Sequence, residues 1–159
     1  IIFDLDNTIT PSYIKEPTKR LKKLFEELKD KGFKLIIMSN SPKYRIEPFK
    51  TYLGVDACAF SLKPRKDKYL KIMDRFKYKS TEIACIGDQL ITDILGANRM
   101  DFTSILVHPL SKKDHTVTFI NRVCENFIYS SLERKDLFKK GKYSSQNSGI
   151  RQRFMEEVL

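Results

Sequence analysis

The first eight residues, Ile1-Ile2-Phe3-Asp4-Leu5-Asp6-Asn7-Thr8, decide both the fold and the kind of site that this chain builds. Their apolar start predicts a buried β-strand, and Asp4 and Asp6 follow it two residues apart. On a strand, that spacing places both side chains on one face. Two carboxylates at the end of a buried strand repel each other, so they are costly unless a cation or a reaction uses them. Taken alone, the stretch also fits a turn, where Asp and Asn are common.

Apolar runs that predict strands alternate with amphipathic segments that predict helices along the rest of the chain. Ser41 is expected to cap the second helix, with Pro42 at its first position. The alternation predicts an α/β domain, a three-layer sandwich in which helices cover both faces of a mostly parallel central sheet. Further strands are expected at 33–38, 57–60, 83–86 and 102–107, and helices at 18–30, 42–53, 67–78, before Met100 and from Thr116 onward.

Composition places the chain among globular proteins of a reducing compartment, which predicts a cytoplasmic location. It has 159 residues, 41% of them hydrophobic and 31% charged, and no apolar run approaches the roughly 18 residues that span a bilayer. Its three cysteines lie far apart, which favours neither a zinc site nor a disulfide framework. Ile1 opens directly on the predicted strand, so we expect no signal peptide, and the lack of an initial methionine indicates that upstream residues are missing.

The formal net charge of +10 predicts an anionic partner. Phosphate esters, anionic lipid headgroups and nucleic acid all fit this charge, which does not choose among them. No nucleic-acid-binding motif accompanies the basic residues. The charge therefore allows two kinds of partner. One is a phosphorylated substrate, and the other is a membrane that the basic surface contacts peripherally.

Polar clusters follow four of the predicted strands, and a parallel sheet brings such clusters together at one edge. Each cluster alone has an ordinary interpretation as a helix cap, a loop or a turn. Together they offer carboxylates for Mg²⁺, an aspartate that can attack phosphorus, an aspartate for proton transfer, and a lysine and hydroxyl for phosphate oxygens. The sequence therefore predicts a phosphoryl-transfer site. The clusters are Asp4 to Thr8, Ser39-Asn40, Lys63-Pro64, and Gly87-Asp88 with Asp93.

The order of these clusters resembles the four motifs of the haloacid dehalogenase (HAD) superfamily, whose first motif reads DxDxT. More narrowly, the stretch from Gly87 to Arg99, Ile105-Leu106-Val107 with Pro109-Leu110, and Asn121-Arg122 are similar to the YqeG family of HAD subclass IIIA phosphatases. The resemblance covers about residues 1 to 130 and implies a HAD-like, Rossmannoid fold. The predicted organisation is a phosphatase domain at 1–135 and a basic, polar C-terminal tail at 136–159 that could form a short helix.

The resemblance implies a role for each residue of the motifs. Asp4 would be the nucleophile that forms an aspartyl-phosphate, and Asp6 the general acid and base. The implied metal site consists of Asp4, Asp6 through its main-chain carbonyl, and Asp88, with Asp93 as a carboxylate behind these ligands or as a contact to the metal through water. The substrate phosphate is expected to bind to Thr8, Ser39, Asn40 and Lys63, and Thr8 would also help to fix the loop.

The short spacing between the motifs leaves no room for a separate cap domain, which predicts an open site. Open sites in this superfamily often serve large substrates, and the YqeG family is related to the mitochondrial phosphatidylglycerophosphate phosphatase. We therefore expect a Mg²⁺-dependent phosphomonoesterase and favour that anionic lipid as its substrate. Two alternatives stay open: a phosphatase for nucleic-acid ends or small sugar or nucleotide phosphates, and a HAD-fold module that binds RNA, the ribosome or a membrane. The sequence does not predict the oligomeric state.

Overall fold

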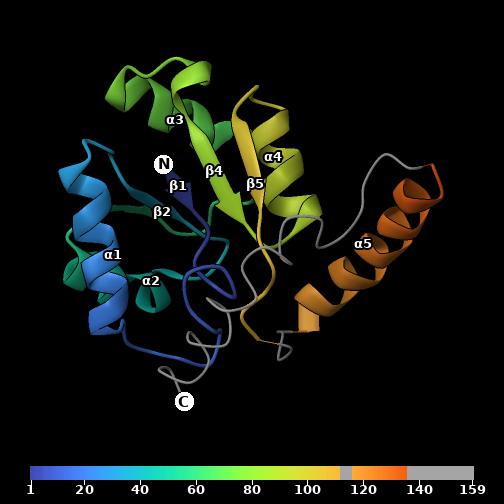
Figure 1. Ribbon diagram of the computed structural model, residues 1–159, viewed down its shortest axis with the longest axis horizontal. Coiled ribbons are helices and arrows are strands. Elements are labelled where there is room, and N and C mark those ends of the chain that lie inside the picture. The colour runs from blue at the N-terminus through green and yellow to red at the C-terminus, as the bar shows by residue number, and fades with distance from the viewer. Residues whose placement is uncertain (112–115, 136–159) are drawn as a thin grey trace. The chain divides into compact units, whose positions relative to one another are not determined.

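A five-stranded parallel sheet forms the centre of the fold, in the order β3-β2-β1-β4-β5 (Figure 1). Neighbouring strands pair in register, with Ile2 opposite both Ile36 and Cys85. The chain winds from β1 to one side of the sheet and then crosses to the other, so the topological switch point lies between β1 and β4. The strands are β1 (Ile2–Phe3), β2 (Ile36–Met38), β3 (Asp56–Cys58), β4 (Ala84–Gly87) and β5 (Thr103–Leu106).

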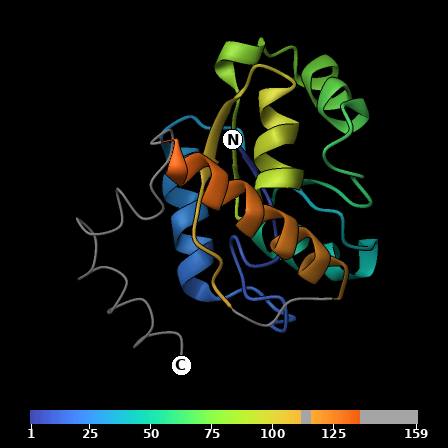
Figure 2. The same ribbon diagram turned by 90° about the vertical axis from the view of Figure 1, so that its right-hand side faces the viewer.

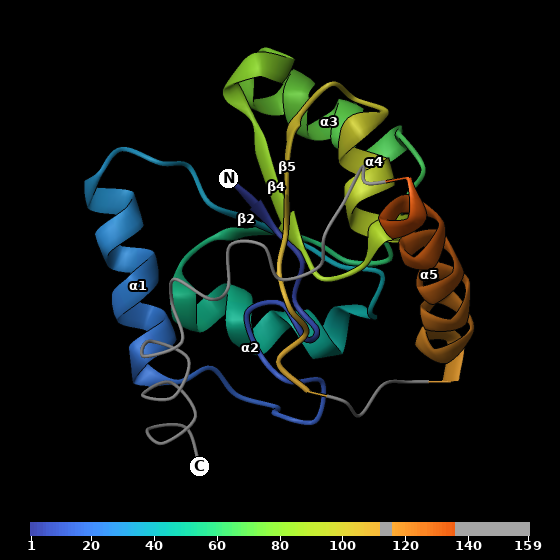
Figure 3. The same ribbon diagram turned by 45° about the vertical axis from the view of Figure 1, so that its right-hand side comes forward.

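Helices cover both faces of this sheet, which confirms the predicted sandwich. The helix pair α1 (Lys19–Asp30) and α2 (Lys43–Leu53) lies on one side, and α3 (Asp67–Phe76) and α4 (Leu95–Asn98) lie on the other (Figures 1 and 3). Side chains alternate between two cores, because Ile2 packs with Tyr69 of α3 whereas Phe3 packs with Phe25 of α1. Two single turns, η1 (Ser80–Glu82) and η2 (Leu90–Ile94), complete this part of the chain.

The first strand is shorter than its sequence suggests, because it ends at Phe3 and leaves both aspartates in the loop that follows. The expectation that Asp4 and Asp6 share one face of a strand is therefore wrong. Asn7 adopts a left-handed conformation with φ 63°, which Asn tolerates better than most residues. The chain turns back there, and Asp6 pairs with Thr10. This loop, dark blue in Figures 1 and 2, lies at the end of the sheet to which the arrow of β4 points.

Local sequence signals set several of the helix ends. The hydroxyl of Thr18 accepts a hydrogen bond of 3.2 Å from the backbone N–H of Leu21, which caps α1. Gly54, with φ 59°, ends α2 in the left-handed conformation that glycine adopts without strain. The predicted cap of α2 is wrong, because Pro42 occupies the cap position and Ser41 precedes it. The Ser41 hydroxyl is instead directed to Asp6.

The computed structural model describes residues 1–111 and 116–135, with side chains of the last helix described only from Cys124 onward. It contains two compact units, Ile1–Asn121 and Arg122–Leu159, and helix α5 (Thr116–Arg134) spans their boundary. The predicted tail at 136–159 lies outside the described residues. Among the described residues, α1 alone separates β1 from β2, so no cap domain interrupts the fold there, and no helix combines the length and hydropathy needed to cross a membrane.

Candidate active site

Residues from four separate loops meet at the carboxyl ends of β1, β2 and β4. The backbone N–H of Asp4 donates to the carbonyl of Ile86 at 2.9 Å, which brings the loop after β1 beside the end of β4. The Nζ atom of Lys63 lies 2.6 Å from Oδ1 of Asp4 and 2.6 Å from Oδ1 of Asp93. Residues 30 to 89 positions apart in sequence are thus gathered by the parallel sheet, as the cluster pattern predicts.

Three buried carboxylates form the centre of the site. Asp4, Asp88 and Asp93 are each at most 8% exposed, and one oxygen from each lies within 4.8 Å of the others. The pKa of Asp4 is raised to about 8, mainly by burial and also by the charges of Asp93 and Asp88, while Lys63 acts in the opposite direction. Three carboxylates beside one ammonium leave excess negative charge in a buried place, which favours a bound cation.

The donor set fits Mg²⁺, because this ion prefers carboxylate oxygens and is commonly held by a few carboxylates together with substrate phosphate. Asp4, Asp88 and Asp93 belong to the predicted metal site. Among the described residues, the carboxylate of Asp6 does not join this group. The predicted contribution of Asp6 to the metal is its main-chain carbonyl. The distances between side-chain oxygens do not test that contribution.

Lys63 is held from two sides. Its ammonium is 4% exposed, and although burial alone would lower its pKa, the charges of Asp4 and Asp93 raise the pKa above its ordinary value. Its backbone is clamped by the side chain of Asn40, which donates to the Lys63 carbonyl at 3.2 Å and accepts from the Lys63 N–H at 2.8 Å. In this structure the Asn40 amide positions the lysine, and its contact with phosphate stays a prediction.

Glycine at position 87 is required by the close approach of Asp93. A Cβ atom built on Gly87 would collide with the Asp93 side chain, so a larger residue there would displace that carboxylate. Asp93 also accepts a hydrogen bond of 3.1 Å from the backbone N–H of Gln89. The pair Gly87-Asp88 therefore does more than form a turn, because it admits the Asp93 carboxylate next to the end of β4.

The hydroxyls of the predicted site have different partners. Thr8 donates to Oδ1 of Asp88 at 3.0 Å, so it orients a carboxylate of the central group. Ser39 is 2% exposed, and its hydroxyl accepts a hydrogen bond of 3.1 Å from the backbone N–H of Ser41. Accepting that bond leaves the hydroxyl proton of Ser39 available for a substrate oxygen. Ser39 is thus better placed than Thr8 for the predicted contact with phosphate.

Asp6 is held by two residues that sequence reasoning did not assign to the site. Its Oδ2 accepts from the Ser41 hydroxyl at 2.6 Å, and its Oδ1 lies 3.0 Å from Nε and 2.8 Å from Nη2 of Arg45. The guanidinium stacks 4.9 Å from the ring centroid of Phe49 and also donates to the carbonyl of Pro11 at 3.4 Å. Such charge-assisted bonds fix the orientation of a carboxylate.

A signal for Arg45 exists in the sequence, although it is weak. Arg45 falls in the first turn of α2, directly after the Ser39-Asn40 cluster, where a cation is unfavourable for the helix dipole. An arginine at that position is therefore expected to have an acidic partner. Its Nη1 atom is buried with no hydrogen-bond partner among the described residues.

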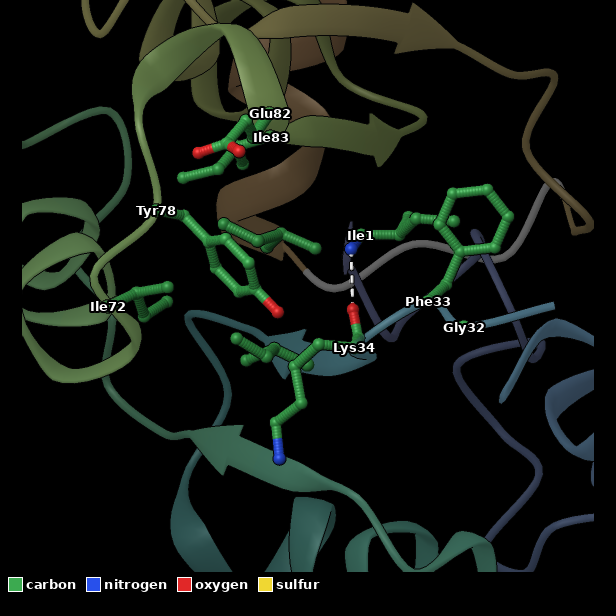
Figure 4. Close-up of a pocket in the computed structure, with 10 residues that line it drawn as sticks. Ile1, Gly32, Phe33, Lys34, Ile72, Tyr78, Glu82 and Ile83 are labelled. Carbon is green, nitrogen blue, oxygen red and sulfur yellow. Dashed lines mark hydrogen bonds between the residues drawn. The ribbon is translucent and has the colours of Figure 1, made fainter. Parts of the chain in front are cut away.

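A separate cavity of about 120 Å³ lies at the opposite end of the sheet (Figure 4). Its walls include Ile1, Ile36 and Ile83, which lie at or just before the amino ends of β1, β2 and β4. The backbone nitrogen of Ile1 donates to the carbonyl of Lys34 there at 2.6 Å. The described lining brings together no group of carboxylates comparable to Asp4, Asp88 and Asp93, so the chemistry belongs to the other edge.

Comparison with known proteins identifies the fold and the family. The model of the haloacid dehalogenase-like hydrolases matches residues 13–101, more than half of the chain. The chain is 38% identical over 135 residues to the probable phosphatase YqeG of Bacillus subtilis, an alignment that covers 85% of this chain and 78% of that protein. It is also 26% identical to a chloroplastic and mitochondrial phosphatidylglycerophosphate phosphatase of Arabidopsis thaliana, over 86% of this chain but only 39% of that protein.

Solved structures support the same fold. An uncharacterized protein from Listeria monocytogenes superposes with a TM-score of 0.56 at 22% identity, over 72% of this chain and 83% of that one. A heptose bisphosphate phosphatase from B. bronchiseptica, solved with magnesium and phosphate, gives a TM-score of 0.54 at 17% identity, over 67% and 78% of the two chains. At these identities the likeness shows the fold alone.

Proposed function

This chain belongs to the haloacid dehalogenase-like hydrolases and is a phosphatase of that family; from this premise we propose that it cleaves phosphate monoesters through an aspartyl-phosphate on Asp4. The observation that carries the proposal is the position of Asp4. Its carboxylate is buried beside two further carboxylates and bonded to Lys63, at the switch point of the sheet. A nucleophile, countercharge and cation ligands are what transfer of a phosphoryl group needs.

In the proposed first step, a carboxylate oxygen of Asp4 attacks phosphorus and the bond between phosphorus and the leaving oxygen breaks. Lys63 holds Oδ1 of Asp4 and thereby orients the nucleophile. Asp6 supplies a proton to the departing alkoxide and becomes a carboxylate. Ser39 donates its hydroxyl proton to a non-bridging oxygen of the phosphoryl group.

In the second step, water attacks the phosphorus of the aspartyl-phosphate and Asp6 accepts the proton of that water. The bond between phosphorus and the Asp4 oxygen then breaks, which releases inorganic phosphate and restores both aspartates. Ser41 and Arg45 hold the Asp6 side chain in the same place during both steps. Asp6 therefore alternates between acid and base from one fixed position.

Mg²⁺ would be held by Asp4, Asp88 and Asp93 together with the main-chain carbonyl of Asp6, and would supply positive charge that neutralises the carboxylates and the substrate phosphate. Thr8 supports this arrangement by its hydrogen bond to Asp88. Asn40 and Gly87 act indirectly, because Asn40 sets the position of Lys63 and Gly87 sets the position of Asp93.

For the substrate we propose an anionic lipid phosphate, with phosphatidylglycerophosphate as the specific candidate. Three features support it: the similarity to the Arabidopsis enzyme of that name, the net charge of +10, and the absence of a cap in the described fold. Phosphates on nucleic-acid ends, sugars or nucleotides share the reacting group and are the competing substrates.

The test is a Mg²⁺-dependent phosphatase screen of the full chain, run beside Asp4→Asn. The panel includes p-nitrophenyl phosphate, phosphatidylglycerophosphate in micelles, a sugar phosphate and a 3′-phosphorylated oligonucleotide. We expect Asp4→Asn to lose at least about 10³-fold in kcat, because the covalent intermediate no longer forms. The control is Asp74→Asn, whose carboxylate is 83% exposed and pairs only with Lys77 among the described residues.

Full activity of Asp4→Asn would disprove the aspartyl-phosphate mechanism. Rapid turnover of another phosphate ester, with none of the lipid, would disprove the proposed substrate and leave the mechanism standing. Salt-sensitive binding of RNA without hydrolysis of any ester would instead favour a binding module.

A further inference from the structure

Two large apolar side chains project into solvent from the loop that carries Lys63. Phe60 and Leu62 are each 57% exposed, although the residues beside them, Ser61 and Lys63, are buried. Both adopt left-handed backbone conformations, with φ 45° and 56°, which residues other than glycine and asparagine adopt only with strain. The chain thus turns two apolar side chains outward at a cost in conformational energy, a pattern that tends to mark function.

This outward arrangement is held firmly by the site itself. The backbone N–H of Phe60 donates to the carbonyl of Ser41 at 3.1 Å. The Ser61 hydroxyl donates to the carbonyl of Ser39 at 2.6 Å and also lies 3.0 Å from that of Cys58. The exposed pair is therefore anchored to the loop that supplies Ser39 and Ser41 to the candidate active site.

A third apolar side chain belongs to the same edge of the sheet. Tyr44 is 80% exposed in the first turn of α2, three residues after Ser41, to which Phe60 is bonded. We call Tyr44, Phe60 and Leu62 the apolar rim. Isolated exposed apolar residues are common, but these three all lie within three residues of the hydrogen-bonded pair Ser41 and Phe60, beside the candidate active site.

The charges around the apolar rim are mostly positive. Lys43, Arg65 and Lys66 are exposed beside it, and the exposed Asp67 pairs with Arg65 at 3.0 Å. Apolar side chains among exposed cations are the pattern of proteins that insert into the interface of an anionic membrane. A second copy of this chain is a poor occupant, because two such surfaces would bring like charges together.

We propose that the apolar rim docks this protein on an anionic lipid surface, with the active site directed at the headgroups. This inference rests on the proposed function, since an enzyme that acts on a lipid phosphate has to reach it at the interface. Phe60 and Leu62 enter the headgroup layer, Tyr44 lies at its boundary, and the exposed cations contact lipid phosphates. An open site without a cap allows this approach.

The experiment measures sedimentation of the full chain with phosphatidylcholine vesicles that contain or lack phosphatidylglycerol. The rim variant is Phe60→Asn with Leu62→Asn, because Asn tolerates the left-handed conformation and keeps the fold. The matched control is Leu24→Asn with Leu70→Asn, which removes leucines that are 47% and 53% exposed on α1 and α3. Both proteins are also assayed on p-nitrophenyl phosphate and on lipid phosphate in vesicles.

We expect the native protein and the control to bind the anionic vesicles and the rim variant to bind about tenfold more weakly. The ratio of turnover on vesicle substrate to turnover on soluble substrate should fall by a similar factor in the rim variant alone. Equal binding by the rim variant and the native protein overturns the docking surface, and so does rim-dependent binding of single-stranded RNA without binding to vesicles. Docking of a protein that hydrolyses no ester would refute the proposed function and support the docking surface.

Discussion

Asp4 and Asp6 are two residues apart, yet they occupy opposite kinds of surroundings. Asp4 is buried on the side of β1 and β4, where two further carboxylates and one lysine surround it. Asp6 is 17% exposed on the side of β2 and α2, where its partners are a hydroxyl and a guanidinium. The difference follows from the end of β1 at Phe3, because the loop after it turns the two side chains toward different elements.

The two aspartates of this short motif are thus suited to two different tasks. The acidic side of the site gathers negative charge, which suits a cation and a nucleophile that is oriented by Lys63. The other side surrounds a single carboxylate with donors, which suits proton transfer from a fixed position. Each of the following predictions tests whether the two sides are as separate as the structure indicates.

The largest effect is expected from Asp6→Asn, which removes proton transfer but leaves the acidic side intact. We expect kcat/KM to fall by about 10² to 10⁴ for an alkyl phosphate, and much less for p-nitrophenyl phosphate, whose leaving group needs no proton. Measurement of kcat/KM over a series of leaving groups checks this. An equal loss across the whole series would contradict a separate role in proton transfer.

A smaller effect is expected from Arg45→Gln, because Asp6 remains but loses its charged donor. We expect kcat/KM for an alkyl phosphate to fall by about tenfold, with the same dependence on the leaving group as Asp6→Asn and partial recovery in Arg45→Lys. Arg75→Gln is the control, since its exposed guanidinium pairs with Asp56 at the start of β3, outside the site. If kcat/KM of Arg45→Gln falls by the same factor for every leaving group, the role of Arg45 is merely structural.

The smallest effect concerns the acidic side alone, through the pKa of Asp4. That pKa is about 8 in the folded protein without metal, against an ordinary value of 3.8. Between about pH 4 and pH 8 the folded state thus holds a proton that the unfolded state has lost, so the stability of the metal-free protein falls as pH rises. Bound Mg²⁺ compensates the charge, and its stabilising effect should be larger at pH 8 than at pH 5.

Thermal unfolding with and without MgCl₂ at the two pH values measures this effect. A binding contribution of about 1 to 2 kcal/mol corresponds to a rise of a few degrees in Tm for a chain of this size. NaCl at the same ionic strength is the control for screening. A Mg²⁺ effect that is equal at the two pH values, or larger at pH 5, would contradict the assignment of the acidic cluster as a cation site.

The sequence predicts the acidic side better than the other side, for a physical reason. Asp4, Asp88 and Lys63 each come after a strand, and a parallel sheet necessarily brings the carboxyl ends of its strands together. The alternation of strands and helices, the cap at Thr18 and the stop at Gly54 are likewise local signals that the structure confirms.

The partners of Asp6 could not be derived in the same way. Ser41 carries a strong local signal for a helix cap, and a tertiary contact with Asp6 outweighs it. Arg45 reaches the site because α2 packs beside the loop after β1, an arrangement that no local pattern encodes. The clamp of Asn40 on Lys63 depends on the same kind of contact between loops.

The loop from Ser39 to Ser41 has a practical consequence for engineering this protein. Its hydrogen bonds reach Asp6, Phe60, Ser61 and Lys63, so one residue inserted there would shift partners in the loops after β1 and β3 at once. Residues 13–16 before α1 are mostly exposed, with Tyr13, Lys15 and Glu16 facing solvent. An additional binding module or specificity domain should therefore be grafted between Tyr13 and Glu16, where the chain can be lengthened without moving the site.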